Sequence, residues 1–303
     1  MTHYQLVTAN KRRSFFVILF FVIFVGAASW LMAYSFDYSF SFVIGALAFS
    51  VAMSFGSYWF SDKLVLATAN AKPANRQDFF DFYTVTENLS ANQRLPMPKL
   101  YVIKDSAINA FATGRDPEHA TVVVTTGLLA RLNRSEIEGV IAHELSHVKN
   151  YDILLMSVVA VLVGFIALLA DWLMRISSLG GGRRRDNKGD GQLQLILIIV
   201  GFLLVLLSPL IANLIKLAIS RKREFLADAS GVAITKNPSG LIHALEKIEE
   251  DQEPLEAANK ATAHLYIGDP LKNHHAGIGW FANLFQTHPP IEERVKALRA
   301  INL

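Results

Sequence analysis

The chain lacks cysteine altogether and carries little charge, since only 18% of its 303 residues are Asp, Glu, Lys or Arg. Soluble domains have about 25% charged residues. Without thiols there is no disulfide framework and no thiolate zinc site, so any metal must be held by His, Asp or Glu. A hydrophobic content of 52% excludes a disordered chain. The net charge is only +3 and the basic residues flank apolar stretches, so we expect no nucleic-acid partner.

Four long stretches are almost free of charge, and each is long enough to cross a bilayer, which takes about 20 apolar residues. They lie between Arg13 and Asp37, between Asp37 and Asp62, from Ile153 to Asp171, and from Gln192 to Ile215. A buried core helix would explain any one of them, but four in one chain favour four hydrophobic helices in a lipid bilayer. The first stretch also has the features of a cleaved signal peptide. Because a second stretch follows at once, a retained anchor is favoured.

Basic residues predict how these helices are oriented. Lys11 to Arg13 precede the first stretch, whereas the link after it holds only the acidic Asp37. Basic flanks stay in the cytoplasm, so the N-terminus, residues 62–152 and residues 220–303 should be cytoplasmic. Arg183 to Arg185, between the third and fourth stretches, would then lie outside, against the same tendency. The sequence therefore leaves open whether these two helices cross fully.

These boundaries divide the chain into four parts. Residues 1–61 are predicted to form two transmembrane helices, 62–152 a first polar part, 153–219 two further hydrophobic helices with a basic loop, and 220–303 a second polar part. The two polar parts together are large enough for one core of ordinary domain size. We therefore expect a membrane α-helical protein with one further domain built from both polar parts.

The first polar part has the pattern of a mixed α and β structure. Apolar residues at helical spacing predict a helix over 77–93, and short apolar runs predict strands of a small sheet over 100–103, 109–114 and 121–126. Ser135 and Glu138 have the spacing of a capping box. We therefore expect a helix that starts there, and the sequence allows it to run unbroken into the third apolar stretch.

The second polar part is predicted to be mainly helical. A helix continues from the fourth apolar stretch through Arg223, and another starts at Asn237-Pro238, where proline suits the first helical position. That helix should stop before Pro254, and a last helix should begin at Pro290. The residues between them have an irregular pattern.

The residues His143-Glu144-Leu145-Ser146-His147 form the pattern H-E-x-x-H. Residues four apart on an α-helix lie about 40° apart on one face, one turn along. Two imidazoles at that spacing can hold one tetrahedral ion. Glu144, beside the first histidine, can reach a metal-bound water without becoming a ligand. The pattern predicts a metal site with a general base, although a helix that merely carries these residues remains an alternative.

A catalytic zinc site needs three protein ligands and one open position for water. Glu224 is the natural third ligand, because it follows the fourth stretch on the side where His143 and His147 precede the third. Asp228 lies four residues further on the same helix face and is placed to accept a hydrogen bond from the outer N–H of His143. The alternative is an ordinary charged helix face beside Arg221 to Arg223.

The segment HELSH at 143–147, followed by a hydrophobic pair and EFLAD at 224–228, resembles the HtpX-type integral-membrane zinc endopeptidases, which are relatives of the CAAX prenyl proteases. Asn109 to Gly114 before the helix, and Thr287 to Pro290 with Arg294 after it, also resemble motifs of that family. The likeness covers nearly the whole chain. It implies a zincin-like α+β catalytic domain with one Zn²⁺ per chain, in a bacterial inner membrane with the catalytic domain cytoplasmic.

The resemblance also implies roles for single residues. The implied zinc ligands are His143, His147 and Glu224, and the implied catalytic carboxylate is Glu144. An edge strand formed by Asn109, Ala110, Phe111 and Ala112 would pair with an extended substrate backbone, which gives affinity with little sequence selectivity. His288 would donate to the developing oxyanion, with Arg294 supporting it at the substrate side. The implied substrates are polypeptides, in particular misfolded membrane proteins.

Two other functions compete with an endopeptidase. Four hydrophobic helices and an Asp171 inside one of them are compatible with a transporter, but that function gives the histidine pair no role. A metal-bound scaffold without catalysis would need the open metal position blocked. We therefore expect a membrane-bound zinc endopeptidase that acts in protein quality control.

Overall fold

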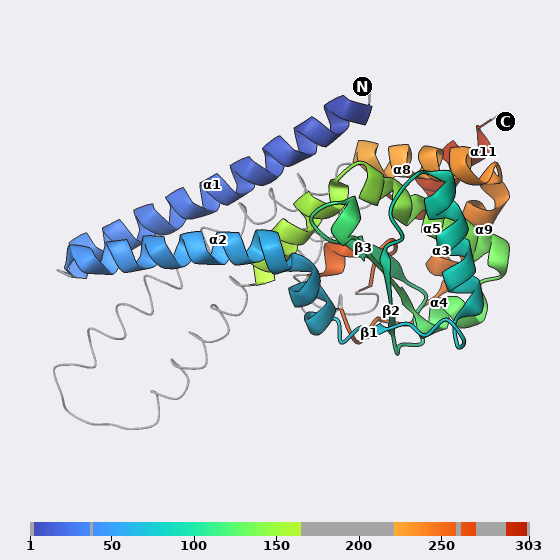
Figure 1. The fold of residues 1–303 in the computed structure, drawn as a ribbon, viewed down its shortest axis with the longest axis horizontal. Coiled ribbons are helices and arrows are strands. Elements are labelled where there is room, and N and C mark those ends of the chain that lie inside the picture. The colour runs from blue at the N-terminus through green and yellow to red at the C-terminus, as the bar shows by residue number, and fades with distance from the viewer. Residues whose placement is uncertain (1–2, 37–38, 165–220, 259–261, 271–288, 302–303) are drawn as a thin grey trace.

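The computed structural model describes residues 3–36, 39–164, 221–258, 262–270 and 289–301. Two long helices, α1 (His3–Phe36) and α2 (Phe40–Thr68), extend side by side as a hairpin from a globular part made of a small sheet and shorter helices (Figure 1). The hairpin corresponds to the first two apolar stretches. The fourth stretch, the basic link before it and Asp171 lie outside the described residues.

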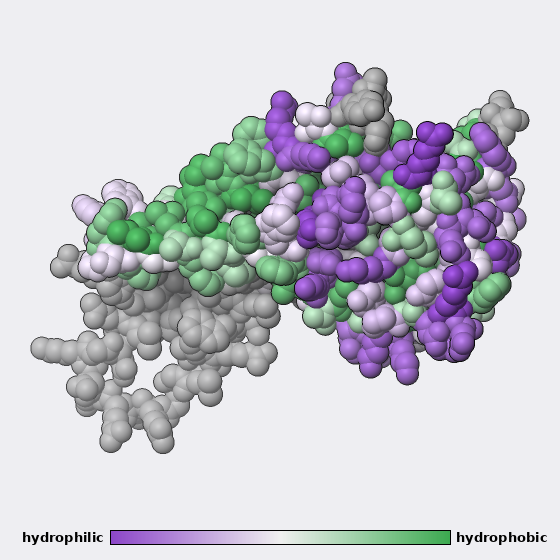
Figure 2. Space-filling model, viewed as in Figure 1, coloured by the Kyte–Doolittle hydropathy of each residue, from purple (hydrophilic) through white to green (hydrophobic). Residues whose placement is uncertain are grey.

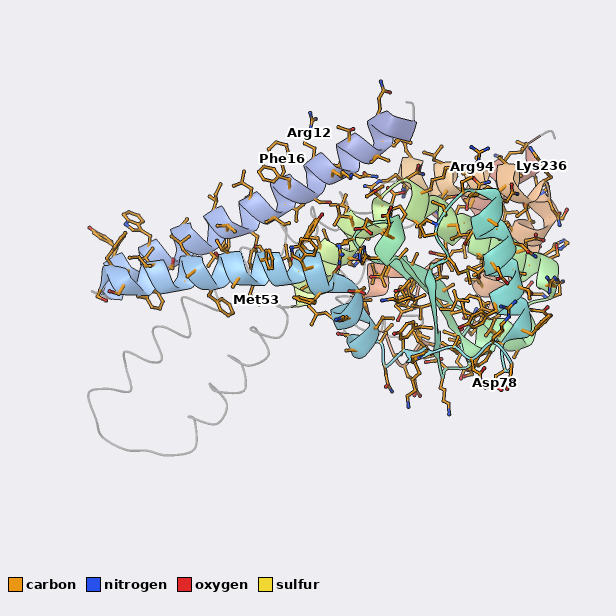
Figure 3. All side chains as sticks on the ribbon, viewed as in Figure 1. Arg12, Phe16, Met53, Asp78, Arg94 and Lys236 are labelled. Carbon is orange, nitrogen blue, oxygen red and sulfur yellow. The ribbon has the colours of Figure 1, made fainter. Side chains whose placement is uncertain are left out.

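The surface of the hairpin is hydrophobic, whereas the globular part is covered by polar residues (Figure 2). Phe16 on α1 and Phe55 on α2 are 55% and 62% exposed. In Figure 3, Phe16 points away from α2, and Arg12 lies closer to the globular part, as expected where a bilayer ends. By length and composition α2 is, among the described helices, the one that qualifies alone to cross a membrane. So large an exposed apolar surface is explained by a bilayer around the hairpin.

The sheet has four strands in the order β1-β2-β4-β3. They are β1 (Lys72–Pro73), β2 (Lys99–Ile103), β3 (Ala110–Thr113) and β4 (Thr121–Thr125). β2 and β4 are parallel, and the outer pairs are antiparallel. The run TVVVT forms a central strand that is buried on both faces, where β-branched residues pack well. The three predicted strands are confirmed as β2, β3 and β4. β3 lies at the edge of the sheet, and the two-residue β1 was not predicted.

The globular part also contains the helices α3 (Phe80–Asn92), α4 (Thr126–Arg131), α5 (Arg134–Lys149), α8 (Arg221–Thr235), α9 (Pro238–Glu250) and α11 (Ile291–Arg299). A further helix, Asp152–Gly164, and the short 3-10 helices Pro117–His119 and Ala263–Leu265 also belong to the described fold. α5 lies at the centre, where it packs against α3, α8, α9 and β3. Its apolar side joins Val122 and Val124 of the sheet and Leu241 of α9 in one core. Residues from both polar parts of the sequence therefore pack in one core.

The capping box of α5 lies two residues earlier than predicted. Asn133, not Ser135, is the N-cap: its side-chain oxygen accepts from the backbone N–H of Glu136 at 3.0 Å, and the Glu136 carboxylate accepts from the backbone N–H of Asn133 at 2.8 Å. The prediction of Ser135 was wrong because asparagine caps a helix as well as serine does. Lys247 adds a 2.7 Å ion pair to Glu136 and so stabilises the earlier start.

The end of α5 also differs from the expectation of a continuous helix. α5 ends at Lys149, and after Tyr151 a second helix, Asp152–Gly164, leaves at an angle of 84°. Tyr151 has a φ of 59°, a left-handed conformation that costs a residue with a side chain about 1–2 kcal/mol. The chain therefore makes a sharp corner one turn after His147.

Candidate metal centre

Three side chains converge in the core between α5 and α8. The Nε2 atoms of His143 and His147 are 3.2 Å apart, and the Glu224 carboxylate oxygens lie 3.7 Å and 3.6 Å from them. All three residues are buried, and one ligand atom from each lies within 4.8 Å of the other two. Two nitrogens that bind one tetrahedral ion at about 2.05 Å would be about 3.3 Å apart. The cluster therefore has the dimensions of a metal site.

The helices themselves create this convergence. His143 and His147 share one face of α5 because four residues make slightly more than one helical turn. α8 crosses α5 closely at Gly231, where a Cβ atom would lie only 3.1 Å from the backbone nitrogen of His143. A side chain there would require the two helices to move apart by a few tenths of an ångström. This close approach brings Glu224, two turns before Gly231, to the two imidazoles.

Asp228 holds the outer nitrogen of His143. Its Oδ1 lies 2.9 Å from Nδ1 of His143, and its two oxygens accept hydrogen bonds of 2.7 Å and 2.9 Å from Arg294 of α11. Burial raises the pKa of Asp228, but the charge and hydrogen bonds of Arg294 outweigh burial and lower that pKa to about 2. The carboxylate therefore stays ionised beside His143.

Asp152 holds the outer nitrogen of His147, a partner that was not predicted. Its Oδ2 lies 3.0 Å from Nδ1 of His147, and Asp152 is almost fully buried. Burial lowers the pKa of His147, but the hydrogen bond to Asp152 and the charge of Glu224 outweigh burial and raise that pKa to about 9. The carboxylates of Asp152 and Glu224 therefore favour a positive charge at His147.

The two outer carboxylates fix which nitrogen of each imidazole faces the centre. A neutral histidine that donates its Nδ1–H to Asp152 or Asp228 presents an Nε2 lone pair to the cluster. Two such lone pairs and the carboxylate of Glu224 then point at one another. Acceptors that converge in this way repel one another unless a cation lies between them, so the donor set fits a metal ion.

Glu144 lies beside the ligands on α5 and is 2% exposed. Burial raises the pKa of its carboxyl group above the usual range, and the charges of His143 and His147 offset part of that effect. A carboxyl group with a raised pKa takes up a proton more readily, as a general base that later donates that proton must. It is not among the three residues whose ligand atoms cluster.

The predicted substrate strand is partly occupied by the chain itself. Ala110 and Ala112 turn their main-chain groups away from β4, because Asn109 and Thr125 are hydrogen bonded in the antiparallel register. The outward carbonyl of Ala110 accepts from the N–H of Ile267 at 2.9 Å. The Asn109 side chain pairs with Gly268 through two bonds of 3.2 Å. Within the described part of the chain, the outward main-chain groups of Ala112 have no main-chain partner.

The remaining predicted site residues lie elsewhere. Phe111 is fully buried, with its ring edge-on to that of Tyr266 at a centroid distance of 4.9 Å. Arg294, predicted at the substrate side, is fully buried behind Asp228 and donates a 3.1 Å hydrogen bond to the carbonyl of Ile267. It therefore connects the partner of His143 to the segment that pairs with β3. His288 lies outside the described residues.

A buried cluster of two histidines and a glutamate, with a second carboxyl group of raised pKa beside it, is suited to hydrolysis by a metal-activated water. Because this cluster lies in a protein with a hydrophobic helix hairpin, the fold and the site together indicate a membrane metalloprotease. The model of peptidase family M48 matches residues 77–302, and the chain belongs to that family. A transporter or a scaffold without catalysis is not favoured.

Similar proteins cover nearly the whole chain. A protease HtpX homolog of Thermoanaerobacter pseudethanolicus is 41% identical over 304 residues, which cover 100% of this chain and 99% of the relative. A protease HtpX homolog of Syntrophobacter fumaroxidans is 46% identical over 258 residues, which cover 84% of this chain and 88% of the relative. The crystal structure of S. mikatae Ste24p has a TM-score of 0.48 and 19% identity, and it covers 97% of this chain and 67% of that chain.

Proposed function

We propose that this protein is a zinc-dependent endopeptidase that hydrolyses misfolded membrane proteins at the cytoplasmic face of a bacterial inner membrane. The observation that carries the proposal is the convergence of His143, His147 and Glu224 at tetrahedral distances. Two imidazoles and a carboxylate, without a thiolate, are the ligand set of many catalytic zinc sites. Three protein ligands leave one position for water. The relatives named protease HtpX homolog support the same activity.

The residues of the chain divide the work of peptide hydrolysis. When bound, zinc supplies a Lewis acid that acidifies a water and polarises the scissile carbonyl. Glu144 takes a proton from the attacking water and delivers it to the leaving amine, which its raised pKa favours. Asp228 and Asp152 keep the two imidazoles in the tautomer that presents Nε2. His288 is the proposed donor to the oxyanion, and loss of such a donor typically costs about 10²–10³ in turnover.

The substrate would bind as an extended strand along the outer edge of β3. The open part of this edge is at Ala112, because Ile267 and Gly268 occupy the edge at Asn109 and Ala110 and the N–H of Gly114 donates to Oγ of Ser157 at 3.2 Å. Main-chain pairing reads few side chains, so chains of many sequences can bind if they are unfolded. This tolerance supports a role in the removal of misfolded proteins.

The ligand set is tested by replacing Glu224 in the full chain, purified in detergent. Zinc sites bind with about 10–16 kcal/mol, so losing one of three ligands should weaken zinc affinity about a thousandfold. Glu224→Ala should therefore retain no zinc after dialysis and should cleave no unfolded casein. Glu138→Gln, on the partly exposed face of α5, is the control and should retain both. Full zinc content in Glu224→Ala would exclude this ligand set.

A further inference from the structure

The corner that follows the metal-binding helix is held by the N-terminal membrane helix. Asn10 of α1 is 2% exposed, and its Nδ2 donates hydrogen bonds of 2.7 Å to Asp152 Oδ1 and 3.0 Å to the carbonyl of Asn150. The next residue, Lys11, places its Nζ 4.3 Å from the centre of the Tyr151 ring. Two successive residues of α1 therefore contact three successive residues of the corner.

Asp152 connects this contact to the metal cluster. One of its oxygens lies 3.0 Å from Nδ1 of His147, and the other accepts from Asn10 and lies 3.5 Å from Nη1 of Arg223. A single buried carboxylate thus has one oxygen on a cluster histidine and the other on the membrane helix. Asn10 and Asp152 are 142 residues apart in the sequence.

We propose that Asn10 and Asp152 are positioning residues that couple the docking of α1 to the metal affinity of His147. The inference rests on the proposed function, in which His147 is a zinc ligand. With Asn10 in place, both oxygens of Asp152 are fixed, and the imidazole is held with Nε2 toward Glu224 and His143. When α1 moves away, Asp152 loses a partner and the strained corner at Tyr151 loses its contacts, so His147 is held less firmly.

The coupling is reciprocal. If docking of α1 strengthens metal binding by a given factor, metal binding strengthens docking of α1 by the same factor. The membrane hairpin then does more than anchor the enzyme. A change that pulls α1 from the globular part lowers zinc affinity without touching a ligand. His143 is held separately, by Asp228 and Arg294.

Zinc affinity of the full chain in detergent, measured by competition with a chromophoric zinc chelator, tests this coupling. Outer partners of metal ligands typically contribute 10–100-fold in affinity, and we expect a loss of about tenfold in Asn10→Leu. Ser14→Ala is the matched control: Ser14 is buried one turn further along α1, and among the described residues its hydroxyl donates to the carbonyl of Asn10 in its own helix. It should bind zinc as the parent does.

Exchange of the two residues separates their hydrogen bond from simple packing. Asn10→Asp alone sets two carboxylates against each other and should weaken zinc binding further than Asn10→Leu. Combining Asn10→Asp with Asp152→Asn restores a donor–acceptor pair, so the double variant should bind zinc more tightly than Asn10→Asp alone and fall short of the parent by the roughly tenfold that Asp152→Asn itself costs. If Asn10→Leu fails to fold, the zinc affinities of Asn10→Asp and of the exchanged pair test the proposal on their own. No recovery, or parental affinity in Asn10→Leu, would overturn the proposal. A parent that binds no zinc would instead refute the proposed function itself.

Hydrogen exchange gives a readout that does not depend on activity. In the parent, zinc should slow amide exchange of residues 5–15 of α1 about tenfold. This factor equals the gain in zinc affinity that docking of α1 provides. In Asn10→Leu, zinc should slow exchange in α5 but not in α1. Unchanged exchange of α1 in zinc-loaded parent would contradict the coupling.

Discussion

The two histidines of the metal cluster lie one turn apart on α5, yet their outer nitrogens are held from different parts of the molecule. Asp228 and Arg294, both from the globular part, hold His143. Asp152, at the start of the helix after the corner, holds His147, with Asn10 of the membrane hairpin behind it. One short motif therefore depends on two separate supports. The site lies where the membrane hairpin and the globular part meet, and both are needed to assemble it.

The largest difference between the two supports should appear in stability. Arg294 is fully buried and is a charged partner, so Arg294→Leu leaves the Asp228 carboxylate in the core with His143 beside it but without its cationic partner. Breaking a buried ion pair in this way costs about 3–5 kcal/mol. Asn10 is neutral, and Asn10→Leu should cost less, about 1.5–3 kcal/mol for a hydrogen bond to a charged group.

Denaturant unfolding of the metal-free chain in detergent measures these costs. Arg299→Leu, on the same helix, is the control for Arg294, because its 2.7 Å ion pair with Glu246 is exposed and should contribute less than about 1 kcal/mol. If Arg294→Leu lowered the free energy of unfolding less than Asn10→Leu does, the support of His143 would contribute less to stability than the support of His147, contrary to this prediction.

The His143 support should also depend on pH. The folded-state pKa of Asp228, about 2, lies below its ordinary value of 3.8. Its contribution to stability is therefore full above pH 3.8 and is lost as the pH falls to 2, by about 2 kcal/mol. In Asp228→Asn this loss should vanish, so the stability difference between parent and variant should shrink from pH 5 to pH 2. A constant difference would show that Arg294 does not hold the carboxylate ionised.

The smallest expected effect concerns the independence of the two supports. Asp228→Asn and Asp152→Asn should each weaken zinc affinity about tenfold, because a neutral amide orients an imidazole less strongly than a carboxylate does. If the supports act separately, the double variant should lose about a hundredfold. Chelator competition measures all three variants. A double variant no weaker than either single one would mean that the two histidines are held as one unit.

The sequence predicts the part of the site that depends on local spacing. His143, Glu144 and His147 follow from a helix that carries H-E-x-x-H, and Asp228 was predicted as the partner of His143 from its spacing to Glu224. The strands β2, β3 and β4 follow from short runs bounded by turns. In each case the signal lies within a few residues of the feature it predicts.

Features that depend on distant contacts could not be predicted. Asp152 directly precedes an apolar stretch, so its charge resembled the flank of a transmembrane helix. Its role depends on the corner at Tyr151, where the sequence has no proline or glycine that would predict a turn. It also depends on Asn10, which lies 142 residues away in the sequence. Arg294 was placed at the substrate side because nothing in the sequence shows that α11 brings it against Asp228. The early start of α5 was missed because two overlapping segments have the capping-box spacing.

The central claim, a metal-dependent peptidase with Glu144 as its base, is tested most directly by one comparison. Zinc-loaded parent and Glu144→Gln, at matched zinc content, are given an unfolded model protein in detergent, with Glu138→Gln as the control on the same helix. We predict cleavage by the parent and by Glu138→Gln, and at least about a hundredfold slower cleavage by Glu144→Gln with its zinc retained. Cleavage by zinc-loaded Glu144→Gln at the parental rate would contradict the account.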